Sequence, residues 1–251
     1  MIVLKDVTFG YPHHAPIFEG FNWEVARGET WAVLGPSGCG KTTLLYLLAG
    51  LNFPASGGVR VDGNDLLRPR PHTGLILQDY GLLPWATVRQ NAELGLDVRR
   101  FYGPDGKHAP TQMPSPGSAT SWLRRLGLAD LADQYPHRLS GGQRQRTAIA
   151  RTLALEPDLL LMDEPFSSLD APTREGLQNL MLELWLEQKF TLIIVTHAIE
   201  EAACLGQKIL VLGIPPHRDT QVVSNPDLLQ PNFRSTPAYQ QLCRELRSRL
   251  N

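Results

Sequence analysis

The sequence predicts an α/β domain built on a mainly parallel sheet. Short apolar segments alternate with helical ones along the 251 residues, as at 30–34 and 41–49, and this alternation is typical of a parallel sheet covered by helices. The wholly apolar run at 159–162 fits a strand buried on both faces. A glycine-rich loop joins 30–34 to 41–49, and a strand, a loop and a helix in that order indicate phosphate binding.

The remaining elements follow from apolar periodicity and from glycine and proline breaks. Further strands are expected at 2–9, 21–25, 57–61, 74–78, 191–195 and 208–212, and helices at 87–96, 119–126, 141–155, around 177–185 and at 237–250. Seven proline and glycine positions, from Gly103 to Gly117, interrupt 103–118, so this stretch is expected to be a loop. The mainly helical part at about 79–138 is interpreted as a subdomain inserted between two strands of the sheet.

Composition limits the classes of function. With 24 basic and 25 acidic side chains the net charge is −1, which gives no electrostatic reason to expect nucleic-acid binding. Three widely spaced cysteines form neither a disulfide framework nor a metal-ligand pattern, and they favour a reducing compartment. The N-terminus does not resemble a signal peptide, and the longest apolar run, at 44–49, is too short for a bilayer span. We therefore expect a cytosolic chain whose membrane role, if it has one, depends on another chain.

The glycine-rich loop matches the P-loop pattern without a gap. Its residues are Gly35, Pro36, Ser37, Gly38, Cys39, Gly40, Lys41 and Thr42. Glycines let successive N–H groups converge on phosphate oxygens, and the helix that follows adds the positive end of its dipole. Lys41 is expected to reach the β- and γ-phosphates of a nucleoside triphosphate, and the Thr42 hydroxyl to bind Mg²⁺.

Two carboxylates, Asp163 and Glu164, follow the apolar run at 159–162. Such a pair alone often only caps the next helix, but together with a P-loop it indicates the second half of an NTPase site. Asp163 is then expected to hold Mg²⁺, and Glu164 to act as the general base for the attacking water.

The segment Leu139, Ser140, Gly141, Gly142 and Gln143 resembles the signature of ATP-binding-cassette (ABC) ATPases, and it stands between the P-loop and Asp163 as it does in that family. The other family motifs have matches too. Gln78 resembles the Q-loop glutamine that contacts Mg²⁺, and Asp170, in Ser168-Leu169-Asp170, resembles the D-loop. His197 resembles the switch histidine, and Tyr11 the aromatic residue that stacks on adenine. Thr43, which follows the P-loop, is also expected to bind the nucleotide.

The resemblance covers residues 1–224 and implies a P-loop NTPase core with a mainly parallel sheet, an antiparallel β subdomain and an inserted α-helical subdomain. Residues 225–251 are expected to be a helical extension whose Leu242, Leu246 and Leu250 pack on the core rather than on a membrane. Two copies of such a chain would sandwich two ATP molecules head to tail. Ser140, Gly141, Gly142, Gln143 and Asp170 would then act in trans, so each monomer would hold only part of a site.

The segment 78–85, with Leu-Pro-Trp at its end, looks like that of importer ATPases for nitrate, sulfonates and taurine. This implies permease subunits, a substrate-binding protein and a peripheral place on the cytoplasmic face of the membrane. Three features depart from the family pattern: the Pro/Gly-rich stretch 103–118, Ala198 where Asp commonly follows the switch histidine, and Gly206-Gln207 before the next strand.

Three alternatives stay open at this stage. The first is an exporter or lipid-transport ATPase, and the second is a cytosolic ABC ATPase that acts on ribosomes or DNA. The second usually carries tandem cassettes or coiled-coil inserts, and this sequence shows neither. The third is a binding module that has lost hydrolysis, against which the presence of Glu164 and His197 argues.

Overall fold

The computed structural model describes residues 1–102 and 117–250, so nearly all of the loop expected at 103–118 lies outside the described residues. The chain forms two compact units. The first comprises Met1–Arg70, Leu161–Glu164 and Gln178–Asn251, and the second comprises Pro71–Leu160 and Pro165–Leu177.

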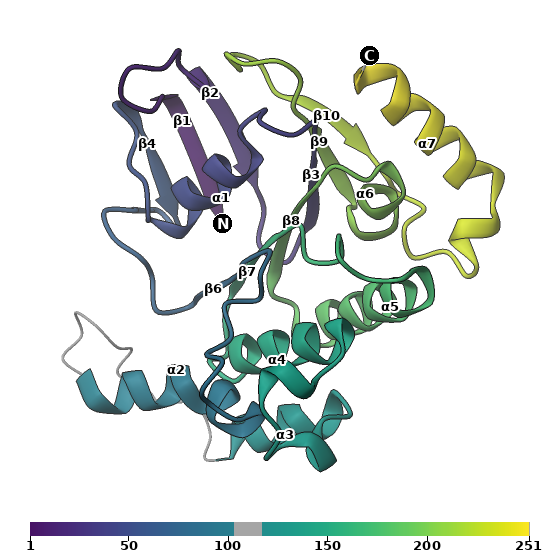
Figure 1. Ribbon diagram of the computed structural model, residues 1–251. Helices are drawn as coiled ribbons and strands as arrows, with labels where there is room; N and C mark the ends of the chain where they lie inside the picture. Colours follow the sequence, from purple (N-terminus) through teal and green to yellow (C-terminus); the bar gives the residue numbers. More distant parts are fainter. Residues whose placement is uncertain (103–116, 251) are drawn as a thin grey trace. The chain divides into compact units, whose positions relative to one another are not determined.

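The first unit contains an antiparallel sheet of strand order β2-β1-β4-β5 (Figure 1). Its strands are β1 (Ile2–Phe9), β2 (Phe18–Val25), β4 (Ser56–Val61) and β5 (Asn64–Asp65). The alternation of apolar residues in β1 slips once, and the register with β2 shifts at the same place, between Leu4 and Val7. Asp6 has a φ of 50° there, so the break in the sequence pattern marks a bulge.

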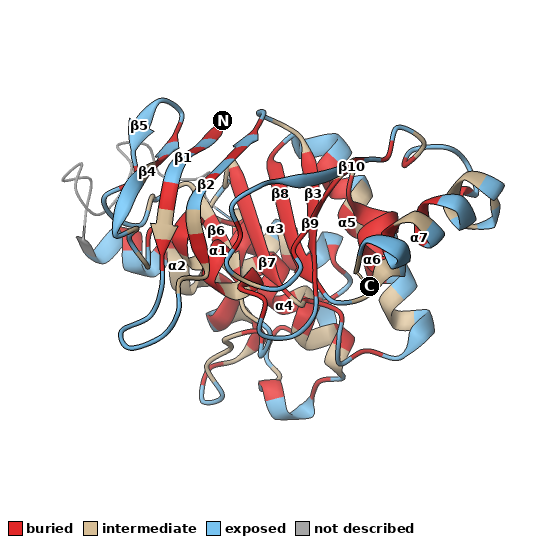
Figure 2. Ribbon diagram, turned by 90° about the horizontal axis from the view of Figure 1, so that it is seen from above, coloured by how far each residue is buried: buried red, intermediate tan, exposed pale blue. Residues whose placement is uncertain are grey.

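The same unit contains four strands of a second, mainly parallel sheet, in the order β10-β9-β3-β8. These are β3 (Thr30–Leu34), β8 (Thr191–Thr196), β9 (Lys208–Val211) and β10 (Gln221–Ser224). β3 pairs in parallel with β8 and with β9, whereas β10 pairs antiparallel with β9. Every residue of β3 and β8 is buried (Figure 2), which explains why both strands are apolar apart from threonines at their ends.

Helices and one further strand complete this unit. They are α1 (Lys41–Ala49), α6 (Ile199–Leu205), α7 (Pro237–Leu250), a 3₁₀ turn at Phe233–Ser235, the end of α5 (Ala171–Gln188) and the last residues of β7 (Leu159–Asp163). Gly50, in the left-handed region, ends α1. On α7, Leu242 and Leu246 are buried in a cluster with residues of α6 and β9, and Leu250 packs against that cluster. The four-residue leucine spacing thus faces the core.

The second unit is mainly helical. It holds β6 (Thr73–Ile76), α2 (Val88–Tyr102), α3 (Ser118–Arg125), α4 (Gly141–Leu153), the first turns of α5 and 3₁₀ turns at Ala129–Leu131 and Pro136–Arg138. Helices α2, α3 and α4 pack on one another. Asn91 is fully buried, and its amide group bonds to Leu83, Ala86 and Thr87, which fixes the segment that enters α2.

The predicted fold class is confirmed: the chain has a mainly parallel sheet, a separate antiparallel sheet and a helical part. Some boundaries were wrong. α2 continues to Tyr102 rather than ending at Leu96, and β6 ends at Ile76, so Gln78 lies in a turn rather than at a strand end. Strand β10 and helix α6 were not predicted. Within residues 1–102 and 117–250, no helix combines the length and apolarity needed to cross a bilayer.

Candidate nucleotide-binding site

The P-loop connects β3 to α1 in the first unit, and its glycines occupy positions that a side chain would disturb. Gly38 and Gly40 have φ values of 80° and 106°, in the region that favours glycine. A Cβ atom on Gly35 would lie 2.5 Å from the carbonyl oxygen of Leu212. The backbone can therefore curl tightly, as convergence of its N–H groups on a phosphate requires.

Lys41 is folded back onto the loop that precedes it. Its side chain is only 5% exposed, and its Nζ donates to the carbonyl oxygens of Gly35 and Pro36, each at 2.9 Å. Nζ also lies 3.7 Å from Glu164 Oε1. A positive charge is thus held next to the loop, with carbonyl partners that a phosphate oxygen could replace.

Asp163 ends β7, and its Oδ1 accepts a hydrogen bond from Thr42 Oγ1 at 3.2 Å. Burial raises the pKa of the Asp163 carboxyl, while the Thr42 hydroxyl and Lys41 act in the opposite direction. A hydroxyl and a carboxylate side by side are the hard oxygen ligands that Mg²⁺ prefers. Thr42 and Asp163 therefore fit the predicted metal site.

Glu164 is held in a strained backbone conformation, with a φ of 43°. Its N–H donates to Val195 O at 3.0 Å, which ties it to β8. Its Oε2 lies 3.0 Å from Nδ1 of His197, the residue directly after β8. The Glu164 side chain is 17% exposed and that of His197 is 53% exposed, so the pair combines a shielded carboxylate with an accessible imidazole.

A hollow of about 510 Å³ lies over the P-loop, within the usual size range of small-molecule sites. It is lined by Tyr11, His14, Ile17, Ser37, Gly38, Gly40, Lys41, Thr42, Thr43 and Glu164. The Tyr11 ring packs edge-on against Phe9, and its hydroxyl lies 3.4 Å from Thr43 Oγ1. His14 and Ile17 were missed by sequence reasoning, and only their closeness to Tyr11 in the chain could have indicated them.

In the second unit the predicted signature forms the start of α4. Ser140 is the N-cap: its Oγ accepts from the N–H of Gln143 at 3.3 Å, and its own N–H donates to Gln143 Oε1 at 2.9 Å. This capping box leaves the N–H groups of Gly141 and Gly142 without partners inside the helix. A Cβ on Gly142 would lie 2.5 Å from Thr173 Cγ2, so the glycine permits close packing against α5.

Hydrogen bonds connect the segment after Gln78 to Ser168 and to helix α4 within the second unit. Tyr80, two residues after Gln78, lies with its hydroxyl 2.7 Å from Ser168 Oγ. Arg151 of α4 donates to the carbonyl oxygens of Tyr80 and Gly81 at 2.7 and 2.6 Å. The Thr173 N–H and side chain bond to the exposed Asp170 carboxylate and lower its pKa.

The structure thus gathers the predicted site residues in two groups. Tyr11, residues 35–43, Asp163, Glu164 and His197 belong to the first unit, whereas Gln78, residues 140–143 and Asp170 belong to the second. The first group includes every side chain expected to contact the nucleotide or Mg²⁺ from within one chain, apart from Gln78.

A profile described as "ABC transporter" matches residues 18–167, which is more than half of the chain. The chain belongs to the ABC transporter family. The P-loop, the signature and both carboxylates lie within the matched residues, and the fold together with the family identifies the chain as an ATPase cassette.

Relatives of this cassette include proteins named for import. The taurine import ATP-binding protein TauB of Pseudomonas aeruginosa is 45% identical over 216 residues, which cover 86% of this chain and 73% of the relative. The aliphatic sulfonates import ATP-binding protein SsuB of Bacillus anthracis is 36% identical over 226 residues, covering 90% and 85%.

Solved structures of ABC cassettes have the same fold. A dimeric post-hydrolysis state of the cassette MJ0796, bound to ADP and Pi, has a TM-score of 0.73 at 29% identity and covers 90% of this chain and 99% of that one. CbiO1 from Clostridium perfringens, part of the cbiONQ transporter complex, has a TM-score of 0.76 at 26% identity, covering 99% and 95%.

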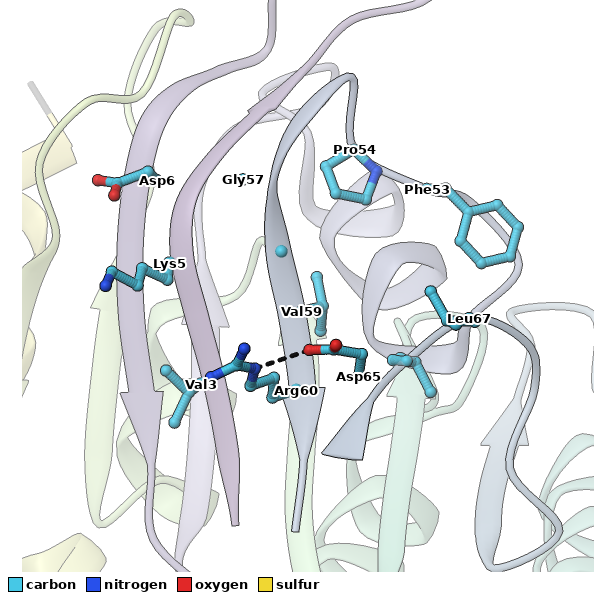
Figure 3. Close-up of a pocket in the computed structure, with 12 residues that line it drawn as sticks. Val3, Lys5, Asp6, Phe53, Pro54, Gly57, Val59, Arg60, Asp65 and Leu67 are labelled. Carbon is cyan, nitrogen blue, oxygen red and sulfur yellow. Dashed lines mark hydrogen bonds and ion pairs between the residues drawn. The ribbon is translucent and has the colours of Figure 1, made fainter. Parts of the chain in front are cut away.

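A second hollow in the first unit of the cassette, of about 530 Å³, lies on the antiparallel sheet (Figure 3). Val3, Phe53, Val59 and Leu67 are among its apolar lining residues, and an ion pair of 2.7 Å joins Arg60 Nε to Asp65 Oδ1 at its wall. None of the predicted site residues lines it. Several of the predicted nucleotide-binding residues instead line the hollow over the P-loop.

Proposed function

We propose that this chain is the ATP-hydrolysing subunit of an importer for a small organic or inorganic anion, such as a sulfonate, taurine or nitrate. The single observation that carries the hydrolytic part is the position of Glu164, whose two carboxylate oxygens face Lys41 and His197 at 3.7 and 3.0 Å. Import rests on the relatives named for taurine and sulfonate uptake.

Hydrolysis follows from the side chains around the P-loop. When ATP enters, Lys41 exchanges its carbonyl partners for β- and γ-phosphate oxygens, and the N–H groups of the loop bind the remaining charge. Thr42 and Asp163 would hold a Mg²⁺ ion, with Gln78 as the third proposed ligand, and the bound ion would neutralise phosphate charge. Tyr11 stacks on the adenine ring.

The proton transfer falls to Glu164. Its carboxylate takes a proton from water as the water oxygen bonds to the γ-phosphorus, and the bond from that phosphorus to the β–γ bridging oxygen breaks. The products are ADP and inorganic phosphate. His197, which is hydrogen-bonded to Glu164, orients the Glu164 carboxylate and stabilises the charge that develops on the γ-phosphoryl group.

A second copy of the chain completes the site. The N–H groups of Gly141 and Gly142 at the start of α4, together with Ser140, Gln143 and Asp170, contact the ATP bound to the partner's P-loop. The support is the capping geometry of α4 and the dimeric form of the similar cassette MJ0796. ATP binding closes this dimer and hydrolysis reopens it.

Membrane subunits form the second class of partner. Trp85, which precedes α2, is 74% exposed, and Pro84 beside it is exposed as well; a large exposed aromatic side chain is typical of an interaction surface. We place the chain at the cytoplasmic face of the membrane, bound to permease subunits that work with a substrate-binding protein.

The test is the steady-state ATPase rate of the Glu164→Gln chain. Loss of the general base is expected to lower kcat by about 10²- to 10⁴-fold, with ATP affinity retained because Lys41 and the loop are unchanged. Glu183→Gln, an exposed glutamate of α5, serves as the matched control and keeps the wild-type rate. An unchanged rate in Glu164→Gln would show that Glu164 is not the base.

A further inference from the structure

His217 lies between β9 and β10 and is only 7% exposed. Its backbone N–H donates to Ile17 O at 2.8 Å, and its backbone carbonyl oxygen accepts from Glu19 N at 3.0 Å. The ring packs against Phe18 with the ring centroids 5.5 Å apart. The imidazole therefore has a fixed position in the interior of the first unit, and the hydrolytic steps described above do not use it.

The imidazole is directed at the P-loop. Nε2 of His217 lies 2.7 Å from the carbonyl oxygen of Cys39, and the contact is buried. A carbonyl oxygen can only accept a hydrogen bond, so Nε2 must carry the proton and donate it. The two residues are 178 positions apart in the chain.

This bond orients a peptide group. In a trans peptide the C=O and the following N–H point in opposite directions because the six atoms are coplanar. Holding the Cys39 oxygen toward His217 turns the Gly40 N–H away from His217. Gly40 lines the hollow over the P-loop, so an N–H turned toward that hollow would face the phosphates of a bound nucleotide.

The peptide needs such a restraint because glycine imposes little of its own. Gly40 has a φ of 106°, and glycine reaches both signs of φ at similar cost. If this peptide rotated, the Cys39 carbonyl dipole would face the phosphates and repel them. A buried donor that fixes the carbonyl removes that alternative.

We infer that His217 is a positioning residue for nucleotide binding: it holds the Cys39–Gly40 peptide so that the Gly40 N–H faces a phosphate of ATP. The inference rests on the proposed nucleotide site at the P-loop. A side chain at position 217 that can donate should preserve the function, and one of similar size without a donor should lose it.

The experiment compares His217→Met with His217→Gln in the full chain. The affinity for Mg-ATP is measured by titration with a fluorescent ATP analogue, and thermal unfolding is recorded without nucleotide. Methionine fills a similar volume but lacks a donor, so the Kd is expected to rise about 10-fold or more, as for about 1.4 kcal/mol. Glutamine is expected to bind within about 3-fold of wild type. His137→Met, on a residue of the second unit, serves as the control and leaves the Kd unchanged.

Two results would overturn the inference: a wild-type Kd in His217→Met, or a Kd in His217→Gln as weak as in His217→Met, which would assign the effect to packing. If His217→Met does not fold, ¹⁵N NMR of the wild-type imidazole decides, because a proton absent from Nε2 would contradict the bond to Cys39. Lys41→Ala distinguishes failure of the proposed nucleotide site from failure of the role of His217. An unchanged Kd in Lys41→Ala would contradict the nucleotide site itself, whereas an unchanged Kd in His217→Met alone would contradict only the role of His217.

Discussion

Gly40→Ala is the most informative single change in the P-loop. At a φ of 106° an alanine is strained, which costs about 1–3 kcal/mol. Its Cβ would also overlap Cγ2 of Ile17, a β-branched side chain that lines the same hollow. Forcing an extra methyl group into packed surroundings costs a further ~1–3 kcal/mol. The loop conformation that binds phosphate is therefore destabilised by about 2–6 kcal/mol, the sum of these two costs.

The affinity for ATP and the thermal stability are measured on the same protein. Each ~1.4 kcal/mol corresponds to a tenfold change in Kd, so Gly40→Ala is expected to weaken ATP binding by at least about 30-fold unless it unfolds the chain. Gly63→Ala is the matched control, since Gly63 also has a positive φ, of 77°, but a Cβ there would meet no atom within 4 Å. The control is expected to lower stability slightly and to leave the Kd unchanged. A wild-type Kd in a folded Gly40→Ala protein would refute the geometric account of the loop.

Two further substitutions test other parts of the site. Tyr11→Ala should raise the Kd for ATP by about 5- to 150-fold through loss of base stacking, worth about 1–3 kcal/mol by analogy with nucleic-acid stacking. Tyr11→Phe keeps the ring and should bind nearly as wild type. Equal affinities of Tyr11→Ala and the wild type in a titration would exclude stacking. Asp163→Asn should abolish Mg²⁺-dependent ATPase activity. Measured by calorimetry without Mg²⁺, its melting temperature should be unchanged or higher, because burial penalises the Asp163 charge. A large fall in this melting temperature would instead assign Asp163 a structural role.

The sequence predicted the ends of β3 and α1 correctly because several signals agree there. A continuous apolar run ends at Gly35, and Gly50 in the left-handed region ends the helix. Local signals were weaker elsewhere. The apolar run at 74–77 does not show where strand pairing stops, so the end of β6 was placed beyond Ile76. Helix α6 has only seven residues, too few for a clear periodic pattern.

The same contrast between strong and weak local signals applies to the residues of the candidate site. Residues that carry chemistry within contiguous motifs, such as Lys41 and Glu164, were predictable from the sequence. Residues that act through tertiary contacts were not, because no local pattern relates His217 to Cys39 across 178 positions. The contacts of Tyr80 with Ser168, across 88 positions, were hidden for the same reason.

In the proposed function, the P-loop is half of an ATP site that a second copy of the chain completes. Light scattering of the purified Glu164→Gln chain, with and without Mg-ATP, tests this most directly, since blocked hydrolysis keeps the closed state populated. We predict a monomer without nucleotide and a dimer at saturating Mg-ATP, and the dimer should be lost when Ser140→Arg is added at the start of α4. A strictly monomeric Glu164→Gln protein at high concentration and saturating Mg-ATP would contradict the account.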